Sequence, residues 1–166
     1  MRFGRTFYVA VLLLCLFEMA RLWLITPDQM AAHFNAQGLP DRFAPKAEFF
    51  WFQAQTLLVV ILVSLPLQVL FLVLPPNLIN MPNREFWLAP ERREETIGRL
   101  NSFGAMLFGV IALMIQTAFE ISAYANLRTP IQFNAGLMGA IMVTGMVVIG
   151  LLLMQLLISF RLPRTK

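Results

Sequence analysis

Four long apolar runs constrain the fold of this chain more than any other feature. They cover residues 6–25, 49–74, 100–124 and 131–160, and the only charged residues within them are Glu18, Arg21 and Glu120. About 20 apolar residues cross the roughly 30 Å hydrocarbon core of a bilayer as a helix. Only helices and closed barrels satisfy their backbone groups in lipid, and uninterrupted runs are typical of helices. We therefore predict four transmembrane helices.

The composition agrees with this prediction. The chain has 166 residues, of which 58% are hydrophobic and only 13% charged, too few charges to cover a soluble domain. The first run is open to a second interpretation as a cleaved signal peptide, because Arg2 and Arg5 precede it. No small-x-small cleavage site follows the run, so we favour an uncleaved helix. The single cysteine, Cys15, excludes an internal disulfide.

Basic residues are unevenly shared among the segments outside the apolar runs. The two ends and residues 75–99 hold most of them, whereas residues 26–48 and 125–130 hold only Arg42, Lys46 and Arg128. Positive residues collect on the cytoplasmic side, so both termini and an inner loop at 75–99 are predicted to be cytoplasmic. The net charge of +4 is thus a topology signal, and no nucleic-acid partner is expected. The expected fold is all-α, a single transmembrane domain over residues 1–166 forming an antiparallel four-helix bundle.

Small residues predict where the helices pack. Just before and within the third run they recur at spacings of three and four, as Gly98, Ser102, Ala105, Gly109 and Ala112. Gln116 and Glu120 extend this stripe. A shorter stripe in the fourth run consists of Gly136, Ala140 and Thr144. Small residues let helix backbones approach closely in lipid, so each stripe is a predicted contact face.

The outer loop at residues 26–48 contains the only histidine, His33, near Asn35 and Asp41. Gly38 can take a positive φ and Pro40 restricts a turn, so these two are predicted to shape the loop. We expect His33, Asn35 and Asp41 to contact a ligand or partner. The alternative is that His33 is an ordinary hydrogen-bonding loop residue.

Three ionisable residues in the apolar runs are predicted to lie at the same depth below this loop. Glu18 and Arg21 share one helical face, and Glu120 lies near the outer end of the third helix. Ionisable groups in lipid are costly and usually face a watery cavity or the bundle interior. A polar pocket floored by these three residues is the functional hypothesis. In the alternative, Glu18 and Arg21 form a structural ion pair and Glu120 reaches headgroup water.

The inner loop carries a second polar cluster. A short amphipathic helix is expected from Pro90, with Phe86 and Trp87 dipping into the inner interface. The cluster is either a solvated, orientation-setting face or a surface for anionic lipid or a partner. Its notable residues are Asn80, Pro82, Asn83, Trp87, Pro90, Arg92 and Arg93.

Two motifs carry a family resemblance. His33-Phe34-Asn35, Gly38 and Pro40-Asp41 together resemble the signature of a bacterial membrane family, domain of unknown function 1648. Asn80-Met-Pro-Asn-Arg-Glu-Phe-Trp-Leu-Ala-Pro-Glu-Arg-Arg resembles the inner-loop motif that comes after it in related proteins. That family is similar to the amino-terminal part of immunity proteins against the sporulation-delaying toxin. The resemblance implies a multi-pass protein of the bacterial inner membrane.

Catalytic patterns are mostly missing from the sequence. It has no zinc-ligand set, no nucleophile near His33 and no phosphate-binding glycine loop, so we expect neither an enzyme nor a cofactor or metal site. We expect a protein that recognises a peptide toxin, a lipid or another membrane protein. The alternatives are an accessory subunit of a larger complex and, less favoured, a proton-coupled transporter or enzyme.

Overall fold

A computed structural model describes residues 2–162 of the chain. Four of its helices are long and apolar enough to cross a membrane, as predicted. They are α1 (Arg2–Ile25), α2 (Lys46–Val73), α4 (Pro90–Ala125) and α5 (Ala135–Ser159). The shorter elements are β1 (Gln29–Phe34), β2 (Pro40–Pro45), the 3-10 turn η1 (Pro76–Leu78) and α3 (Arg84–Trp87).

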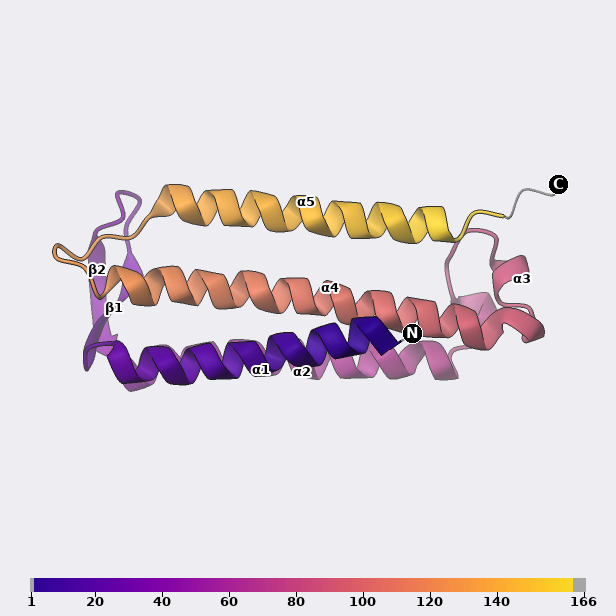
Figure 1. The fold of residues 1–166 in the computed structure, drawn as a ribbon, viewed down its shortest axis with the longest axis horizontal. Coiled ribbons are helices and arrows are strands. Elements are labelled where there is room, and N and C mark those ends of the chain that lie inside the picture. The colour runs from indigo at the N-terminus through magenta and orange to yellow at the C-terminus, as the bar shows by residue number, and fades with distance from the viewer. Residues whose placement is uncertain (1, 163–166) are drawn as a thin grey trace.

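Helix α4 is the centre of the molecule. Consecutive long helices run antiparallel, with α1 and α2 on one side of α4 and α5 on the other (Figure 1). α4 packs against all three, whereas α5 makes no comparable contact with α1 or α2 within the described residues. The β1–β2 pair lies at one end of the bundle, here the hairpin end, and α3 lies at the other, the α3 end. α1 begins and α5 ends toward the α3 end.

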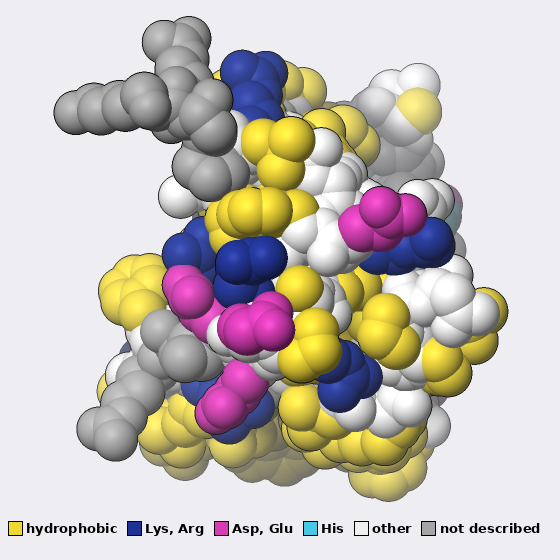
Figure 2. All heavy atoms as spheres, turned by 90° about the vertical axis from the view of Figure 1, so that its right-hand side faces the viewer, with side chains coloured by type: hydrophobic (Ala, Val, Ile, Leu, Met, Phe, Trp, Pro, Cys, Tyr) yellow, Lys and Arg dark blue, Asp and Glu magenta, His cyan; other side chains and the backbone are white. Residues whose placement is uncertain are grey.

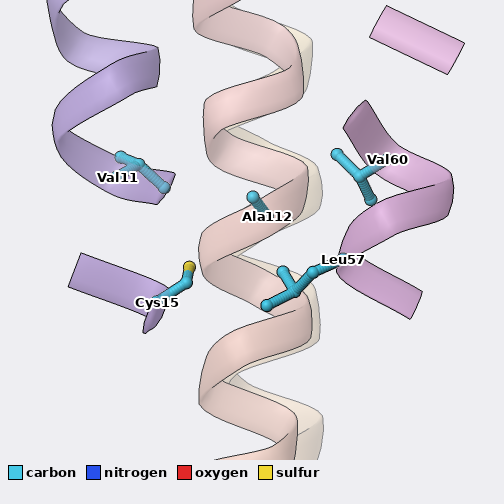
Figure 3. Close-up of a cluster of buried hydrophobic side chains, with 5 residues drawn as sticks. All are labelled: Val11, Cys15, Leu57, Val60 and Ala112. Atoms are coloured by element: carbon cyan, nitrogen blue, oxygen red, sulfur yellow. The ribbon is translucent and has the colours of Figure 1, made fainter. Parts of the chain in front are cut away.

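The small-residue stripe of α4 forms the contact with α1 and α2, as predicted. Ala112 lies between Val11 and Cys15 of α1 and Leu57 and Val60 of α2 (Figure 3). Nearer the α3 end, the backbone of Gly4 donates a hydrogen bond to Ser102 Oγ at 3.2 Å. A Cβ at Gly109 would lie 2.6 Å from the ring of Phe7. The absence of larger side chains on this stripe is what lets the three helices approach.

The predicted contact face of α5 is wrong. Gly136, Ala140 and Thr144 are all exposed, and the buried residue of this helix is Gly145. Gly145 lies against the side chain of Met114, with no room for a Cβ. A stripe of small residues permits a close approach, but the bulky side chain on the neighbouring helix decides which stripe is used.

The outer segment is a β-hairpin, which an all-α prediction with a loop at 26–48 did not foresee. β1 and β2 pair antiparallel, with Met30 opposite Ala44 and His33 opposite Arg42. α2 then begins at Lys46, three residues before the apolar run. β2 begins and ends with proline, and apolar and polar residues alternate only weakly in this segment. The sequence therefore gives little indication of strands here.

The inner connection is shorter than predicted. Residues 90–99 do not form a separate amphipathic helix but are the first turns of α4, which runs unbroken from Pro90 to Ala125. Pro90 occupies the first turn, where its missing N–H costs nothing. No proline comes after it before the apolar run starts, so the helix continues.

Candidate functional site

The tip of the hairpin is closed by Asn35. Its Oδ1 accepts hydrogen bonds from the backbone N–H groups of Gln37 and Leu39, both at 3.0 Å. Gly38 has a φ of +76°, which glycine adopts without strain. The predicted shaping role of Gly38 therefore fits its conformation. The Oδ1 atom of Asn35 is engaged in its own turn, and the predicted ligand contact of Asn35 stays a prediction.

The hairpin is fastened to the segment that joins α4 to α5. The amide side chain of Asn126, which is buried at the end of α4, bonds both backbone groups of Ala31. At the tip, Gly38 O accepts from Phe133 N at 2.8 Å, and the rings of Phe34 and Phe133 stack with centroids 5.2 Å apart. Two strands alone are marginally stable in water, so these contacts explain why the hairpin has one position.

Three pairs of ionisable side chains lie on the hairpin and at the start of α2. His33 Nδ1 and Asp41 Oδ1 are 2.6 Å apart on neighbouring strands. Arg42 pairs with Glu48 at the start of α2, and Lys46 Nζ lies 2.9 Å from Asp28 Oδ1. The side chain of His33 is 67% exposed, so it remains accessible despite its partner.

A cavity of about 800 Å³ opens beneath the hairpin, between α2, α4 and α5. We call it the hairpin cavity. Its rim is ionisable and consists of His33, Asp41, Arg42 and Glu48. Its walls are largely apolar and aromatic, with Phe49, Trp51 and Phe52 from α2, Ala118 and Phe119 from α4, and Met138 from α5. Gln55 and Ser122 are the remaining polar lining residues.

Glu18 and Arg21 form a separate group on α1. Arg21 Nε donates to Glu18 Oε2 at 2.7 Å, and a terminal nitrogen of Arg21 donates to the hydroxyl of Tyr124 on α4, also at 2.7 Å. The guanidinium also lies 5.6 Å from the centre of the Tyr124 ring. The pair is thus held between α1 and α4. Tyr124 was missing from the predicted set because only the tertiary contact brings it to Arg21.

Glu120 belongs to a third group, a chain of amides between α2 and α4. Gln53 Nε2 donates to Gln116 Oε1 at 2.9 Å, and Gln116 Nε2 donates to Glu120 Oε1 at 3.0 Å. Gln53 is fully buried, and its Oε1 has no hydrogen-bond partner among the described residues. Such a chain fixes the register of α2 on α4 through hydrogen bonds between the two helices.

The structure does not assemble the single pocket predicted from sequence. Of the six proposed contact residues, only His33 and Asp41 line the hairpin cavity. Successive α-helical residues are 100° apart, so Glu120 and Tyr124 project from α4 toward α1, and Ala118 and Ser122 project away from it. α4 therefore separates the half-buried Glu18 and Glu120 from the hairpin cavity. The helix face on which these residues lie therefore differs from the prediction, and their common depth in the membrane stays a prediction.

The inner motif clamps the end of α5. Asn83 Nδ2 and Trp87 Nε1 both donate to the carbonyl oxygen of Phe160, each at 2.9 Å. Asn83 takes a left-handed backbone conformation with a φ of 52°. The Trp87 ring lies edge-on to Phe160, so it packs against the end of α5, and its predicted place at the membrane interface stays a prediction.

Basic residues of the same motif hold its backbone. Arg92 donates to Phe86 O at 2.7 Å and lies over the Phe86 ring, and Arg93 donates to Leu74 O at 3.0 Å. Acidic side chains lie among the basic ones on this end of the molecule (Figure 2). Asn80 and Pro82 are exposed, and Pro90 starts α4. Most of the motif thus has a structural task, which the sequence pattern could not distinguish from a binding surface.

These features can be compared with known proteins. Residues 9–57 match the family described as Domain of unknown function (DUF1648). The match covers α1 from residue 9, the whole hairpin and the first part of α2, so it includes His33, Asn35, Gly38, Pro40 and Asp41. It ends before the inner motif, whose resemblance stays a prediction. Neither a curated protein nor a solved structure matches the chain.

The hairpin cavity offers hydrogen-bonding and charged side chains at its rim and apolar side chains along its walls. Within residues 2–162, no group of three or more His, Cys, Asp or Glu side chains is placed to hold a metal ion. The chain is a multi-pass membrane protein that carries a domain of unknown function.

Proposed function

We propose that this protein binds an amphipathic, lipid-like molecule in the hairpin cavity, with its polar head at the hairpin and its apolar chain between α2 and α5. The single observation that carries the proposal is the continuity of an ionisable rim with an aromatic wall inside one cavity. The volume of about 800 Å³ lies within the range of roughly 300–1,000 Å³ usual for small-molecule sites.

The rim supports recognition of a polar head. The side chains of His33, Arg42 and Glu48 are each more than half exposed, so their hydrogen-bonding capacity is not exhausted by the ion pairs. An ion pair exposed to this degree is worth little, about 0–1 kcal/mol, and can be exchanged for contacts to a ligand. The rim thus offers both donors and acceptors to a head group.

The hairpin favours a lipid-like ligand over an extended peptide. A peptide that adds to a sheet needs a row of free backbone N–H and C=O groups at a strand edge. Asn126 already occupies the backbone of Ala31 on β1. β2 begins at Pro40 and ends at Pro45, and proline has no N–H to donate. The walls below offer mainly apolar side chains, which suit an acyl chain.

In this proposal the protein lies in the bacterial cytoplasmic membrane with the hairpin end outward, and it acts by binding and not by catalysis. The resemblance to the amino-terminal part of toxin-immunity proteins supports a recognition role. A second candidate is an accessory subunit of a larger complex, favoured by the exposure of most of α5. A stoichiometric partner that co-purifies in mild detergent would support the second candidate.

Photo-crosslinking tests the lipid proposal. The protein, reconstituted in bilayers, is exposed to a phospholipid with a photoactivatable acyl chain, and crosslinked peptides are identified by mass spectrometry. Ala118→Phe places a ring in the cavity and should reduce crosslinks at Phe52 and Met138. Ala140→Phe is the matched control, because Ala140 is an exposed residue of α5 outside the cavity lining. The proposal would be refuted if the two variants gave equal lipid crosslinks at Phe52 and Met138. It would also be refuted if only an added hydrophobic peptide reduced those crosslinks.

A further inference from the structure

A second cavity, of about 430 Å³, lies at the α3 end where α1, α2 and α4 meet. We call it the inner cavity. Its lining includes Arg5 of α1, Leu72 of α2, and Arg93, Glu94 and Asn101 of α4. The inner cavity and the hairpin cavity lie at opposite ends of the bundle and share no lining residue. A ligand bound in the inner cavity is therefore independent of the proposed function.

The inner cavity lies where the charged and the apolar parts of its three helices meet. Arg5 directly precedes the apolar part of α1, and Leu72 is two residues from the end of the α2 run. The polar first turns of α4 give way to its apolar part at Leu100, beside Asn101. All three helices therefore cross the boundary between charge and hydrocarbon at this cavity, where a phospholipid carries its phosphate.

Two buried polar atoms of the lining lack hydrogen-bond partners. Asn101 is only 4% exposed, and its Oδ1 makes no hydrogen bond to the described residues. Arg93 Nε is also buried and unpaired within the described chain, although another nitrogen of the same side chain bonds Leu74 O. Buried polar groups are rarely left unsatisfied, and each such group requires an explanation. Here one is an acceptor and the other a donor.

Each of these atoms is complementary to one end of a zwitterionic head group. The guanidinium groups of Arg5 and Arg93 are donors that suit the oxygens of a phosphodiester. Asn101 Oδ1 and the carboxylate of Glu94 are acceptors that suit an ammonium group. Arginines alone would suit any phosphate, but a ligand that also carries a donor can satisfy the buried Asn101 Oδ1.

We infer that the inner cavity is a binding site for a phospholipid with an ethanolamine head group. The phosphate lies between Arg5 and Arg93, the ammonium bonds Asn101 Oδ1 and faces Glu94, and the acyl chains pass along Leu72 and Ile97. A choline head group keeps the phosphate and the positive charge but has no N–H, so it cannot satisfy Asn101. Free inorganic phosphate lacks both the ammonium group and the acyl chains.

Native mass spectrometry of the full chain in detergent tests this inference. Equimolar phosphatidylethanolamine, phosphatidylglycerol and phosphatidylcholine of the same chain length are added as competitors. The wild-type protein should retain the ethanolamine lipid about tenfold over the choline lipid, as expected for one hydrogen bond to a charged group. Phosphatidylglycerol, whose hydroxyl is a donor without positive charge, should fall between them. Equal retention of all three, or preference for phosphatidylglycerol, would overturn the assignment.

Variants separate the head-group contact from folding. Asn101→Ala should abolish the preference for ethanolamine over choline, and Asn101→Asp should keep it because the acceptor remains. Since Oδ1 is unpaired without lipid, Asn101→Ala should not lower the melting temperature in lipid-free detergent. Arg5→Gln should weaken retention of all three lipids, whereas Arg99→Gln, an arginine paired with Glu95 outside the cavity lining, serves as the control. An unaltered lipid preference in Asn101→Ala would overturn the inference.

Discussion

The side chain of Asn126 completes the edge of β1 at Ala31. Asn126 Oδ1 accepts from Ala31 N at 2.6 Å, and Asn126 Nδ2 donates to Ala31 O at 3.2 Å. This is the pair of hydrogen bonds that a residue of a third strand would make. One amide at the end of α4 thus ties the His33-bearing hairpin to the helices below it.

Replacing Asn126 should release the hairpin. Asn126→Ala leaves the buried N–H and C=O of Ala31 unpaired, at a cost of about 2–4 kcal/mol in the free energy of unfolding. Hydrogen exchange over residues 29–45 should become faster. Gln132→Ala, an exposed residue of the neighbouring loop, is the control and should change neither quantity. Unchanged exchange in Asn126→Ala would mean that the hairpin is held by other contacts.

Substitution of Gly38 should move the hairpin tip away from Phe133. At a φ of +76° an alanine is strained, and its Cβ would lie 2.5 Å from Phe133 O. Gly38→Ala should therefore cost about 1–3 kcal/mol, measured as a loss of thermal stability. Gly139→Ala on α5 is the matched control, because a Cβ there has nothing within 4 Å. The assignment fails if the two variants melt at the same temperature.

The amide pair of Gln53 and Gln116 should show coupling. Gln116→Leu removes the acceptor for Gln53 Nε2 and leaves a buried amide with no partner, so it should destabilise the protein. In the double variant Gln53→Leu/Gln116→Leu both polar groups are gone, and much of the loss should be recovered. We expect a coupling of about 1 kcal/mol in a double-mutant cycle, typical of membrane interiors. Additive effects would rule out the coupling.

Asn83 contributes to the contact with α5 in two ways, through its hydrogen bond to Phe160 O and through its left-handed backbone conformation. Asn83→Gly keeps the left-handed conformation but loses the hydrogen bond to Phe160 O, at about 1 kcal/mol. Asn83→Ala loses the bond and adds backbone strain of about 1 kcal/mol. Limited proteolysis near the end of α5 should therefore rise in the order wild type, glycine, alanine. The reverse order for the two variants would show that the conformation at Asn83 is unimportant.

The predicted orientation can be tested with engineered thiols. Cys15 is fully buried, so a Cys15→Ala background should remain folded with only a small packing loss. In that background, His33→Cys should react with a membrane-impermeant maleimide in intact spheroplasts. Glu85→Cys, exposed at the α3 end, should react only after lysis. Labelling of Glu85→Cys before lysis would place the hairpin on the cytoplasmic side and contradict the proposed function.

Sequence reasoning predicted the spans well because burial in lipid acts on each segment alone. The four helices, their antiparallel order and the packing stripe of α4 can be inferred from apolar length and from small residues at helical spacing. The candidate site was predicted in part. His33 and Asp41 meet at the hairpin, but Asn35 closes a turn. Glu18 and Arg21 lie on α1, and none of Glu18, Arg21 and Glu120 lines the hairpin cavity.

The sequence of each segment by itself thus determines whether it can span a membrane, because about 20 apolar residues are enough for one span. Which faces meet is decided only by packing among helices. Met114 packs against Gly145, whereas Gly136, Ala140 and Thr144 are exposed. Tyr124 reaches Arg21, and Asn126 reaches Ala31, across separations of 103 and 95 residues. Contacts this distant depend on how side-chain shapes fit in three dimensions, and a local pattern does not name the partner residue.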